Sequence, residues 1–203
     1  MTLRVGRASR RLAALLEDII AEQTPILLLG PPGVGKTTLL RAMSDSISQD
    51  YVTVIVDPTG EIAGSGDSCH PAVGRSRKEA AYSDQDTDRS AARRLAMGRA
   101  VENMGCQVLV VDEIGTEMEA LAARTLGERG VQLLATAHGK TIRNLLSNNE
   151  LRDLLGGFRT VVIGDLNPRY IDQGKKNITE RVAAPVFKTP GVDPFLNTPG
   201  DPP

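Results

Sequence analysis

Residues 26–37 read Ile26-Leu27-Leu28-Leu29-Gly30-Pro31-Pro32-Gly33-Val34-Gly35-Lys36-Thr37 and contain the complete pattern G-x-x-x-x-G-K-[ST]. The apolar run predicts a buried strand, and the residues after the loop predict a helix. Glycines in such a loop let backbone N–H groups turn towards a polyphosphate, because no Cβ blocks the approach. The helix start adds free N–H groups and a partial positive charge. This stretch therefore predicts a nucleotide-binding strand–loop–helix unit.

The positions of this loop have separate expected roles. Lys36 is expected to reach the β- and γ-phosphates, and the Thr37 hydroxyl is expected to ligate Mg²⁺. ATP and Mg²⁺ are therefore the expected cofactors. The alternative is a glycine-rich turn with a chance lysine. That alternative does not explain why a strand, the loop and a helix follow one another in the order that a phosphate-binding loop requires. The residues expected to bind the nucleotide are Gly30, Pro31, Pro32, Gly33, Val34, Gly35, Lys36, Thr37 and Thr38.

Composition limits the class of protein. The 203 residues are 40% hydrophobic and 24% charged, as in ordinary globular proteins. The formal net charge of −1 gives no overall field that attracts nucleic acid or an anionic membrane. Aromatic residues make up 3% and Trp is absent, which disfavours base-stacking platforms. No apolar run reaches the ~20 residues of a membrane span, and two cysteines make no disulfide framework.

Strands and helices are expected to alternate along the chain. Residues 1–184 are expected to form one domain, and residues 185–203 a Pro- and Gly-rich disordered tail. Residues 60–88 are polar and predict a loop excursion. The alternation predicts an α/β fold with a central, mainly parallel five-stranded sheet covered on both faces. The expected strands are 26–29, 51–56, 108–111, 131–135 and 160–163. The expected helices are 9–23, 38–48, 90–104 (capped by Ser90), 116–128 (headed by a capping box) and 145–155.

An acidic pair follows the third expected strand. Asp112 is expected to hold Mg²⁺ through its water shell, opposite Thr37. Glu113 is expected to orient and polarise the attacking water. The alternative is a solvated acidic turn. The carboxyl ends of strands are where ligands bind in such sheets, and the phosphate loop lies there too.

Two further strand ends carry polar residues. Asp57 and Glu61 follow the second strand, and Glu61 rivals Glu113 as the group that activates water; spacing does not decide between them. Thr136 and His138 end the fourth strand, where either could sense the γ-phosphate by hydrogen bonding. A surface turn with a chance histidine is the alternative.

Arginines and metal-like patterns complete the candidates. Arg75 and Arg77 could contact nucleotide or reach a neighbouring subunit as arginine fingers, or be solvated loop charges. Arg124 and Arg129 offer the same possibility. Asp84, Asp86 and Asp88 resemble the start of a calcium-binding loop. The pattern does not continue, because Arg89 stands where that loop needs glycine and Leu95 where it needs glutamate. A zinc site also fails for lack of paired C-x-x-C spacing among Cys69, His70, Cys106 and His138.

From about residue 5 to residue 185 the chain resembles a P-loop ATPase family known from cyanobacteria and plastid genomes as a conserved hypothetical chloroplast reading frame. That family is related to the stage III sporulation protein AA ATPases and, more distantly, to the hexameric secretion ATPases. The blocks at 110–123 and 128–139 are much more specific than a phosphate loop alone. The resemblance rests on residues 30–37, 61–64, 70–75, 110–123 and 128–139.

The resemblance implies an AAA/RecA-like three-layer core that hydrolyses ATP as a homo-oligomeric ring, possibly a hexamer, with active sites between subunits. Lys36, Thr37, Asp112 and Glu113 match the ATPase motifs, and an acidic box after the second strand of secretion ATPases supports Glu61. Typical family members continue into a small domain that binds single-stranded nucleic acid. Here only a Pro-rich tail is expected, so nucleic-acid binding does not carry over. The implied location is the chloroplast stroma or the bacterial cytoplasm.

The leading hypothesis is a Mg²⁺-dependent ATPase that couples hydrolysis to conformational change in a homo-oligomer. The second hypothesis is an assembly module that binds nucleotide as a switch with little turnover. A small-molecule kinase is the third, and it is disfavoured because no Arg-rich lid is evident.

Overall fold

The structure is a computed structural model that describes residues 13–65, 68–79, 88–141, 143, 147, 158–163 and 178–182. Its centre is a seven-stranded sheet with strand order β3-β2-β4-β5-β1-β6-β7. All neighbouring strands run parallel except β7, which is antiparallel to β6. The strands are β1 (Ile26–Gly30), β2 (Thr53–Val56), β3 (Arg77–Glu79), β4 (Val108–Val111), β5 (Gln132–His138), β6 (Arg159–Ile163) and β7 (Ile178–Val182).

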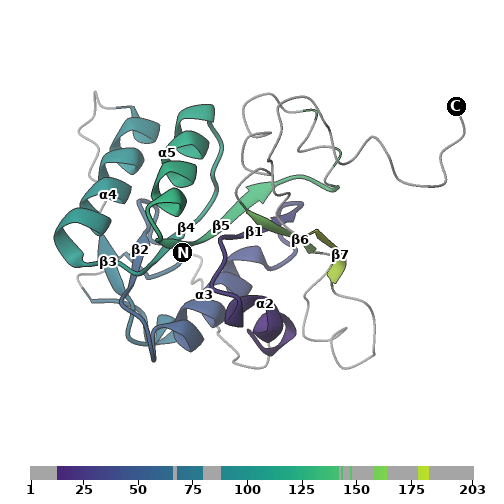
Figure 1. The fold of residues 1–203 in the computed structure, drawn as a ribbon, viewed down its shortest axis with the longest axis horizontal. Helices are drawn as coiled ribbons and strands as arrows, with labels where there is room; N and C mark the ends of the chain where they lie inside the picture. The colour runs from purple at the N-terminus through teal and green to yellow at the C-terminus, as the bar shows by residue number, and fades with distance from the viewer. Residues whose placement is uncertain are drawn as a thin grey trace, which may run out of the picture.

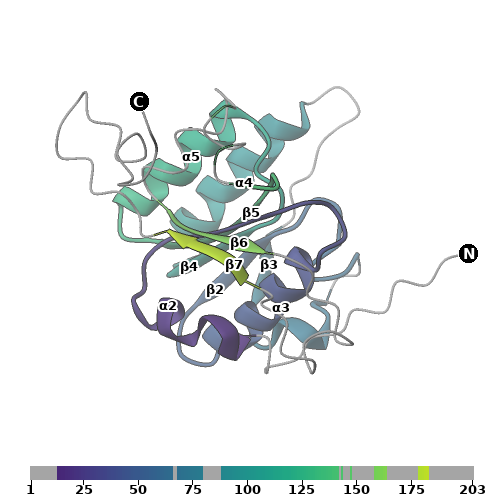
Figure 2. The same cartoon turned by 90° about the vertical axis from the view of Figure 1, so that its right-hand side faces the viewer.

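Helices cover the two faces of this sheet, which gives three layers (Figure 1). The edge-on view in Figure 2 shows α4 and α5 on one face and α2 and α3 on the other. The expected three-layer α/β fold is thereby confirmed. The helical elements are η1 (Ala14–Leu16), α2 (Glu17–Ala21), α3 (Lys36–Ile47), η2 (Pro71–Val73), α4 (Arg89–Met104) and α5 (Glu117–Glu128).

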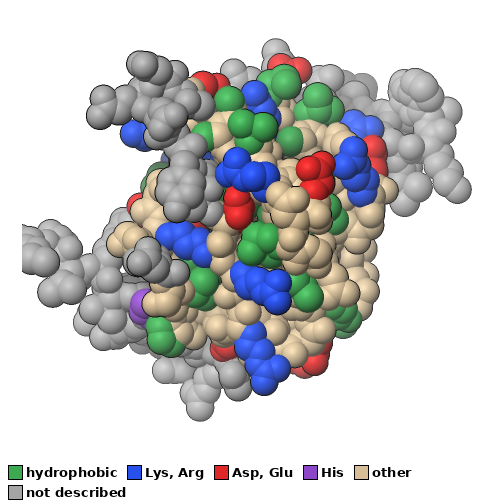
Figure 3. Space-filling view, turned by 90° about the vertical axis from the view of Figure 1, so that its left-hand side faces the viewer, with side chains coloured by type: hydrophobic (Ala, Val, Ile, Leu, Met, Phe, Trp, Pro, Cys, Tyr) green, Lys and Arg blue, Asp and Glu red, His purple; other side chains and the backbone are tan. Residues whose placement is uncertain are grey.

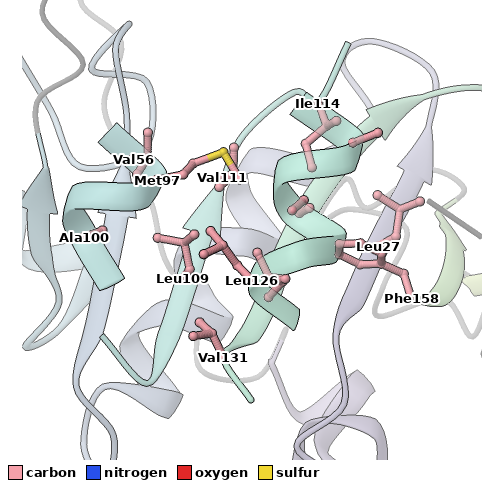
Figure 4. Close-up of a cluster of buried hydrophobic side chains, with 14 of the residues drawn as sticks. Leu27, Val56, Met97, Ala100, Leu109, Val111, Ile114, Leu126, Val131 and Phe158 are labelled. Atoms are coloured by element: carbon pink, nitrogen blue, oxygen red, sulfur yellow. The ribbon is translucent and has the colours of Figure 1, made fainter. Parts of the chain in front are cut away.

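The strands are apolar on both sides because both faces of the sheet are buried. Successive side chains of a strand point to opposite faces, so Leu27 and Leu29 join the core under α4 and α5. Ile26 and Leu28 join the core under α2 and α3. Figure 4 shows the first core, in which Leu27, Leu109, Leu126 and other labelled side chains pack together. Burying one such leucine contributes about 2 kcal/mol, so both cores hold the sheet in place.

The strand order brings the candidate residues to one edge of the sheet. β5 lies between β1 and β4, with Leu28 opposite Thr136 and Val111 opposite Ala135. The carboxyl ends of β1, β4 and β5 therefore lie side by side. β5 also runs to His138, beyond the expected end at residue 135, so Thr136 and His138 belong to the strand itself.

All five expected strands are present, and two were not expected. The loop prediction for residues 60–88 was wrong at η2 and β3. Because β3 is only Arg77–Glu79, with charged side chains, its sequence has no apolar strand signal; backbone pairing with β2 makes it a strand. The five-residue β7 was missed because only its two end residues are apolar and a charged pair lies between them.

The start of α4 also differs from the expectation. Asp88, not Ser90, is the N-cap: its carboxylate accepts the Ser90 N–H at 3.0 Å. Ser90 lies inside the helix, where its hydroxyl is 2.9 Å from that of Thr116. The capping box at Thr116 is confirmed. Apart from Ser147, the expected helix 145–155 lies outside the described residues, as do the tail 185–203 and residues 9–12 of the first helix.

The molecule's side at β3 and α4 mixes basic, acidic and hydrophobic side chains (Figure 3). Within the described ranges, no helix is long and apolar enough to cross a membrane.

Candidate functional site

The phosphate loop joins β1 to α3 at the carboxyl edge of the sheet. Gly33 and Gly35 have φ values of +81° and +103°, a region that favours glycine. A Cβ at Gly33 would meet no atom within 4 Å, so its conformation and not crowding calls for glycine. No side chain caps the start of α3. Its first N–H groups are therefore available to an anion, which fits a polyphosphate.

Lys36 is buried within this loop. Its Nζ donates to the carbonyl oxygens of Gly30 at 2.7 Å and Pro31 at 3.0 Å, and lies 3.3 Å from His138 Nδ1. Burial lowers the Lys36 pKa, while the carboxylates of Asp112 and Glu113 act in the opposite direction. The ammonium is thus held inside the loop by carbonyl groups, in a place where negative phosphate oxygens would favour its charged form.

Asp112 connects the loop to the next two strands. The Thr37 hydroxyl donates to its Oδ2 at 2.9 Å, and the Thr136 hydroxyl donates to its Oδ1 at 2.5 Å. A hydroxyl and a carboxylate are oxygen ligands of the kind that Mg²⁺ prefers. Within the described ranges no three His, Cys, Asp or Glu side chains gather as a metal site. The hydroxyl of Thr37 and the carboxylate of Asp112 are the described groups that could hold a Mg²⁺ ion together with phosphate oxygens.

Glu113 and His138 lie beside this group. His138 Nε2 is 2.9 Å from Glu113 Oε1, while the other ring nitrogen faces Lys36. The Glu113 side chain is 62% exposed, so water reaches its carboxylate. Its backbone has φ +59°, an unusual value for a residue with a side chain, and its N–H donates to the Thr136 hydroxyl at 2.8 Å. The structure thus joins residues that the sequence suggested separately.

Asp57 has a different environment. It is 2% exposed, and its carboxylate accepts the backbone N–H groups of Glu61, Ile62 and Ala63 at 3.0, 2.9 and 2.7 Å. Arg41 of α3 donates to the carbonyl oxygens of Glu61 and Ile62. Asp57 therefore folds the loop that follows β2. Glu61 therefore lies next to α3 at Arg41, which is one helical turn beyond Thr37 in that helix.

The arginines singled out by sequence lie elsewhere. Arg75 and Arg77 line a cavity of about 260 Å³ with residues 48–53, at the amino end of β2 and thus away from the phosphate loop. Arg124 pairs with Glu128 at 3.1 Å on the exposed side of α5, and Arg129 follows the end of that helix. None of these positions is at the carboxyl edge where Lys36 and Asp112 meet.

Sequence reasoning missed one arginine that does reach this edge. Arg93 of α4 donates to the Glu113 carbonyl oxygen at 2.7 Å. A single arginine within a helix belongs to no recognisable motif, and Arg93 is 20 residues from Glu113 in the sequence. No sequence signal therefore pointed to this contact.

The cysteines lie on opposite faces of the sheet. Cys106 belongs to the core under α4 and α5, whereas Cys69 packs at the core under α2 and α3. Burial raises the pKa of the Cys106 thiol to about 11, so it stays protonated at neutral pH. His70 accepts the Ala72 N–H at 3.0 Å and caps η2. These contacts are structural.

The fold and site define a protein of the P-loop class. The family described as "Sporulation stage III, protein AA" matches residues 4–168, and the chain belongs to this family. The chain is 44% identical over 196 residues to the "Uncharacterized protein ycf45" of Porphyra purpurea and 41% identical over 189 residues to "Protein SEEDLING PLASTID DEVELOPMENT 1" of Arabidopsis thaliana. It is 31% identical over 134 residues to the stage III sporulation protein AA of Bacillus subtilis.

The comparisons differ in coverage. The Porphyra and Arabidopsis matches include 93% and 92% of this chain but only 32% and 27% of those proteins, so the chain spans about a third of their length. The Bacillus match includes 63% of this chain and 41% of that protein.

Solved structures share the fold. The VirB11 ATPase of the Brucella suis type IV secretion system matches with a TM-score of 0.55 and 16% identity, over 85% of this chain and 55% of that chain. The ATPase DotB of Yersinia pseudotuberculosis matches with a TM-score of 0.50 and 14% identity, over 72% of this chain and 41% of that chain. At such identities the likeness establishes the fold, and the chemistry depends on the residues themselves.

Proposed function

We propose that this chain is a Mg²⁺-dependent ATPase domain that hydrolyses ATP to ADP and phosphate and couples turnover to conformational change in a homo-oligomer. The observation that supports this most is one hydrogen-bonded cluster at the carboxyl ends of three adjacent strands. It joins a buried lysine, a hydroxyl–carboxylate pair and an exposed carboxylate with its histidine. The members of this cluster are Lys36, Thr37, Asp112, Glu113, Thr136 and His138.

In this proposal, residues 30–38 bind the phosphates through backbone N–H groups at the start of α3. Lys36 neutralises phosphate charge, and Thr37 and Asp112 hold Mg²⁺. The bound nucleotide supplies the γ-phosphoryl group for transfer to water. Thr136 fixes both partners of the acidic pair, because its hydroxyl donates to the Asp112 carboxylate and accepts the Glu113 N–H.

Glu113 is the proposed general base. Its carboxylate is exposed to water, so it can orient a water molecule and accept its proton. His138 connects this carboxylate to Lys36 of the phosphate loop. His138 holds the carboxylate through Nε2 and is placed to respond to changes at Lys36 through Nδ1. Glu61 stays a rival base, since its segment is bound to α3 by Arg41.

The assembly and location are further parts of the proposal. We propose a ring, possibly a hexamer, in which Arg75 or Arg77 reaches the nucleotide of the neighbouring subunit, since both lie far from the chain's own phosphate loop. The name of the Arabidopsis relative supports a plastid location, and the Bacillus relative supports a bacterial cell as the alternative. Residues 1–184 remain the proposed domain.

A nucleotide-dependent assembly switch with little turnover is the second candidate. It is favoured by the contacts within the site: Asp112 is bonded to Thr37, and Glu113 to His138, so nucleotide binding would rearrange these contacts and could signal the bound state without hydrolysis. A switch would bind ATP and change its oligomer size without releasing phosphate.

One experiment separates the candidates. Phosphate release from ATP is measured for the wild type, Lys36→Ala, Glu113→Gln and Glu61→Gln, with native mass determined in the same samples. The ATPase proposal expects Mg²⁺-dependent turnover that is lost in Lys36→Ala. ATP binding and a mass change without phosphate release would support the switch instead.

A further inference from the structure

An ion pair that is largely shielded from solvent links α4 to α5, and the same arginine contacts the loop that follows β4. Arg93 Nη1 donates to the carbonyl oxygen of Glu113 at 2.7 Å and to Oε1 of Glu119 at 3.1 Å. The two side chains are 15% and 3% exposed. Arg93 Nε is also buried and has no hydrogen-bond partner. Leaving a buried N–H group without a partner costs free energy. The contacts of Nη1 must therefore be what holds the guanidinium in this position.

Glu119 extends this link to the rest of the loop. Its Oε2 accepts the backbone N–H groups of Gly115 at 3.0 Å and Thr116 at 3.3 Å. The hydroxyl of Ser90, one turn before Arg93, lies 2.9 Å from the Thr116 hydroxyl. The first turns of α4 thus contact the loop at Glu113 and Thr116 directly, and at Gly115 through Glu119.

The Glu113 backbone depends on these contacts. Its φ of +59° lies in the left-handed region, which a residue with a side chain keeps only when its surroundings fix it. Thr136 holds the N–H side of Glu113, and Arg93 holds the carbonyl side. Because the backbone sets the direction of the side chain, both contacts decide where the Glu113 carboxylate lies.

We propose that Arg93 is a positioning residue for ATP hydrolysis, which keeps the Glu113 backbone left-handed and so directs its carboxylate. This inference rests on the proposed function. Arg93 acts through the Glu113 carbonyl and Glu119 without touching the nucleotide. A lysine keeps the charge, but its ammonium sits on a shorter, more flexible stem than the rigid guanidinium, so it should hold the two acceptors of Nη1 less firmly; Arg93→Lys is therefore the most informative substitution.

The test compares Arg93→Lys with Arg99→Lys. Arg99 lies on the same helix and pairs with Glu79 at 2.8 Å, away from the loop. We expect Arg93→Lys to lower kcat by about tenfold to a hundredfold, with KM for ATP and Tm close to the wild type. Amide hydrogen exchange of residues 113–116 should accelerate in Arg93→Lys only. Arg99→Lys should match the wild type in kcat and in exchange.

A double variant distinguishes loss of positioning from the destabilisation caused by an unpaired charge. Arg93→Met with Glu119→Gln removes both buried charges together, so neither is left unpaired. We expect its kcat to stay low. Wild-type kcat in the double variant, or unchanged kcat and exchange in Arg93→Lys, would overturn the proposal, as would a parallel loss of kcat, ATP affinity and Tm. If the wild type releases no phosphate, the proposed function fails, while the exchange comparison still decides whether Arg93 fixes this loop.

Discussion

Asp57 and Asp112 follow neighbouring buried strands and look alike in the sequence, yet their partners differ. The Asp57 carboxylate is surrounded by backbone N–H groups of its own loop, which cannot leave without unfolding that loop. The Asp112 carboxylate is bonded to hydroxyls of Thr37 and Thr136, which can rotate away. An acidic residue at a strand end is therefore structural or reactive according to whether its donors are fixed or exchangeable.

The largest expected effect concerns the base. We expect Glu113→Gln to lower ATP turnover by about a thousandfold, because the amide cannot accept a proton from water. Glu61→Gln is the matched change in the Asp57 loop and should leave turnover within about threefold, since the Asp57 contacts use only the Glu61 backbone. Steady-state phosphate release measures both. The reverse ranking would move the base to Glu61 and make the Asp57 loop part of the reaction.

Asp112→Asn should lower turnover by about a hundredfold, because the amide is a poor Mg²⁺ ligand. Folding should change little, since the amide oxygen still accepts from a hydroxyl. Titrating Mg²⁺ at saturating ATP tests this, and the variant should need a higher Mg²⁺ concentration. An unchanged Mg²⁺ dependence would contradict the role given to Asp112.

Asp57→Asn should act on stability instead. Losing the charge weakens three bonds to backbone N–H groups, so we expect a loss of about 2 kcal/mol in the free energy of unfolding. Thermal unfolding should show a Tm lower by about 5 °C. Turnover per folded molecule should stay near that of the wild type. A large loss of turnover at unchanged Tm would erase the contrast with Asp112.

The smallest expected effect is the uptake of protons when ATP binds. Burial lowers the Lys36 pKa in the nucleotide-free protein, and phosphate oxygens favour the charged form and raise it again. Since the pKa is higher in the complex, binding should take up protons at pH values between the two pKa values, and the uptake should vanish at pH values well below both. Calorimetry in buffers of different ionisation enthalpy measures this uptake. Lys36→Arg, which stays charged throughout, should show none.

The sequence predicted the parts with strong local signals and missed those set by distant contacts. The phosphate loop, the five apolar strands and the capping box at Thr116 were recognisable because each has a local pattern. β3 was missed because its three residues are all charged, and β7 was missed because a charged pair interrupts its short apolar signal; their pairing with β2 and β6 reveals them. The separate environments of Asp57 and Asp112, and the reach of Arg93, depend on chain segments at least 20 residues apart or on loop folding, which composition and spacing do not encode.

The edge strand β3 has a further consequence. Among the described residues no other strand pairs with its outer edge, yet the strand is only Arg77–Glu79 and every residue in it is charged. Lys78 donates to the Gly64 carbonyl oxygen at 2.6 Å and Glu79 pairs with Arg99, so two of its side chains are tied to the body of the protein. Short, charged edges resist the addition of another strand, which protects a sheet against aggregation. Subunits that assemble must then meet through side chains and not by extending the sheet at β3.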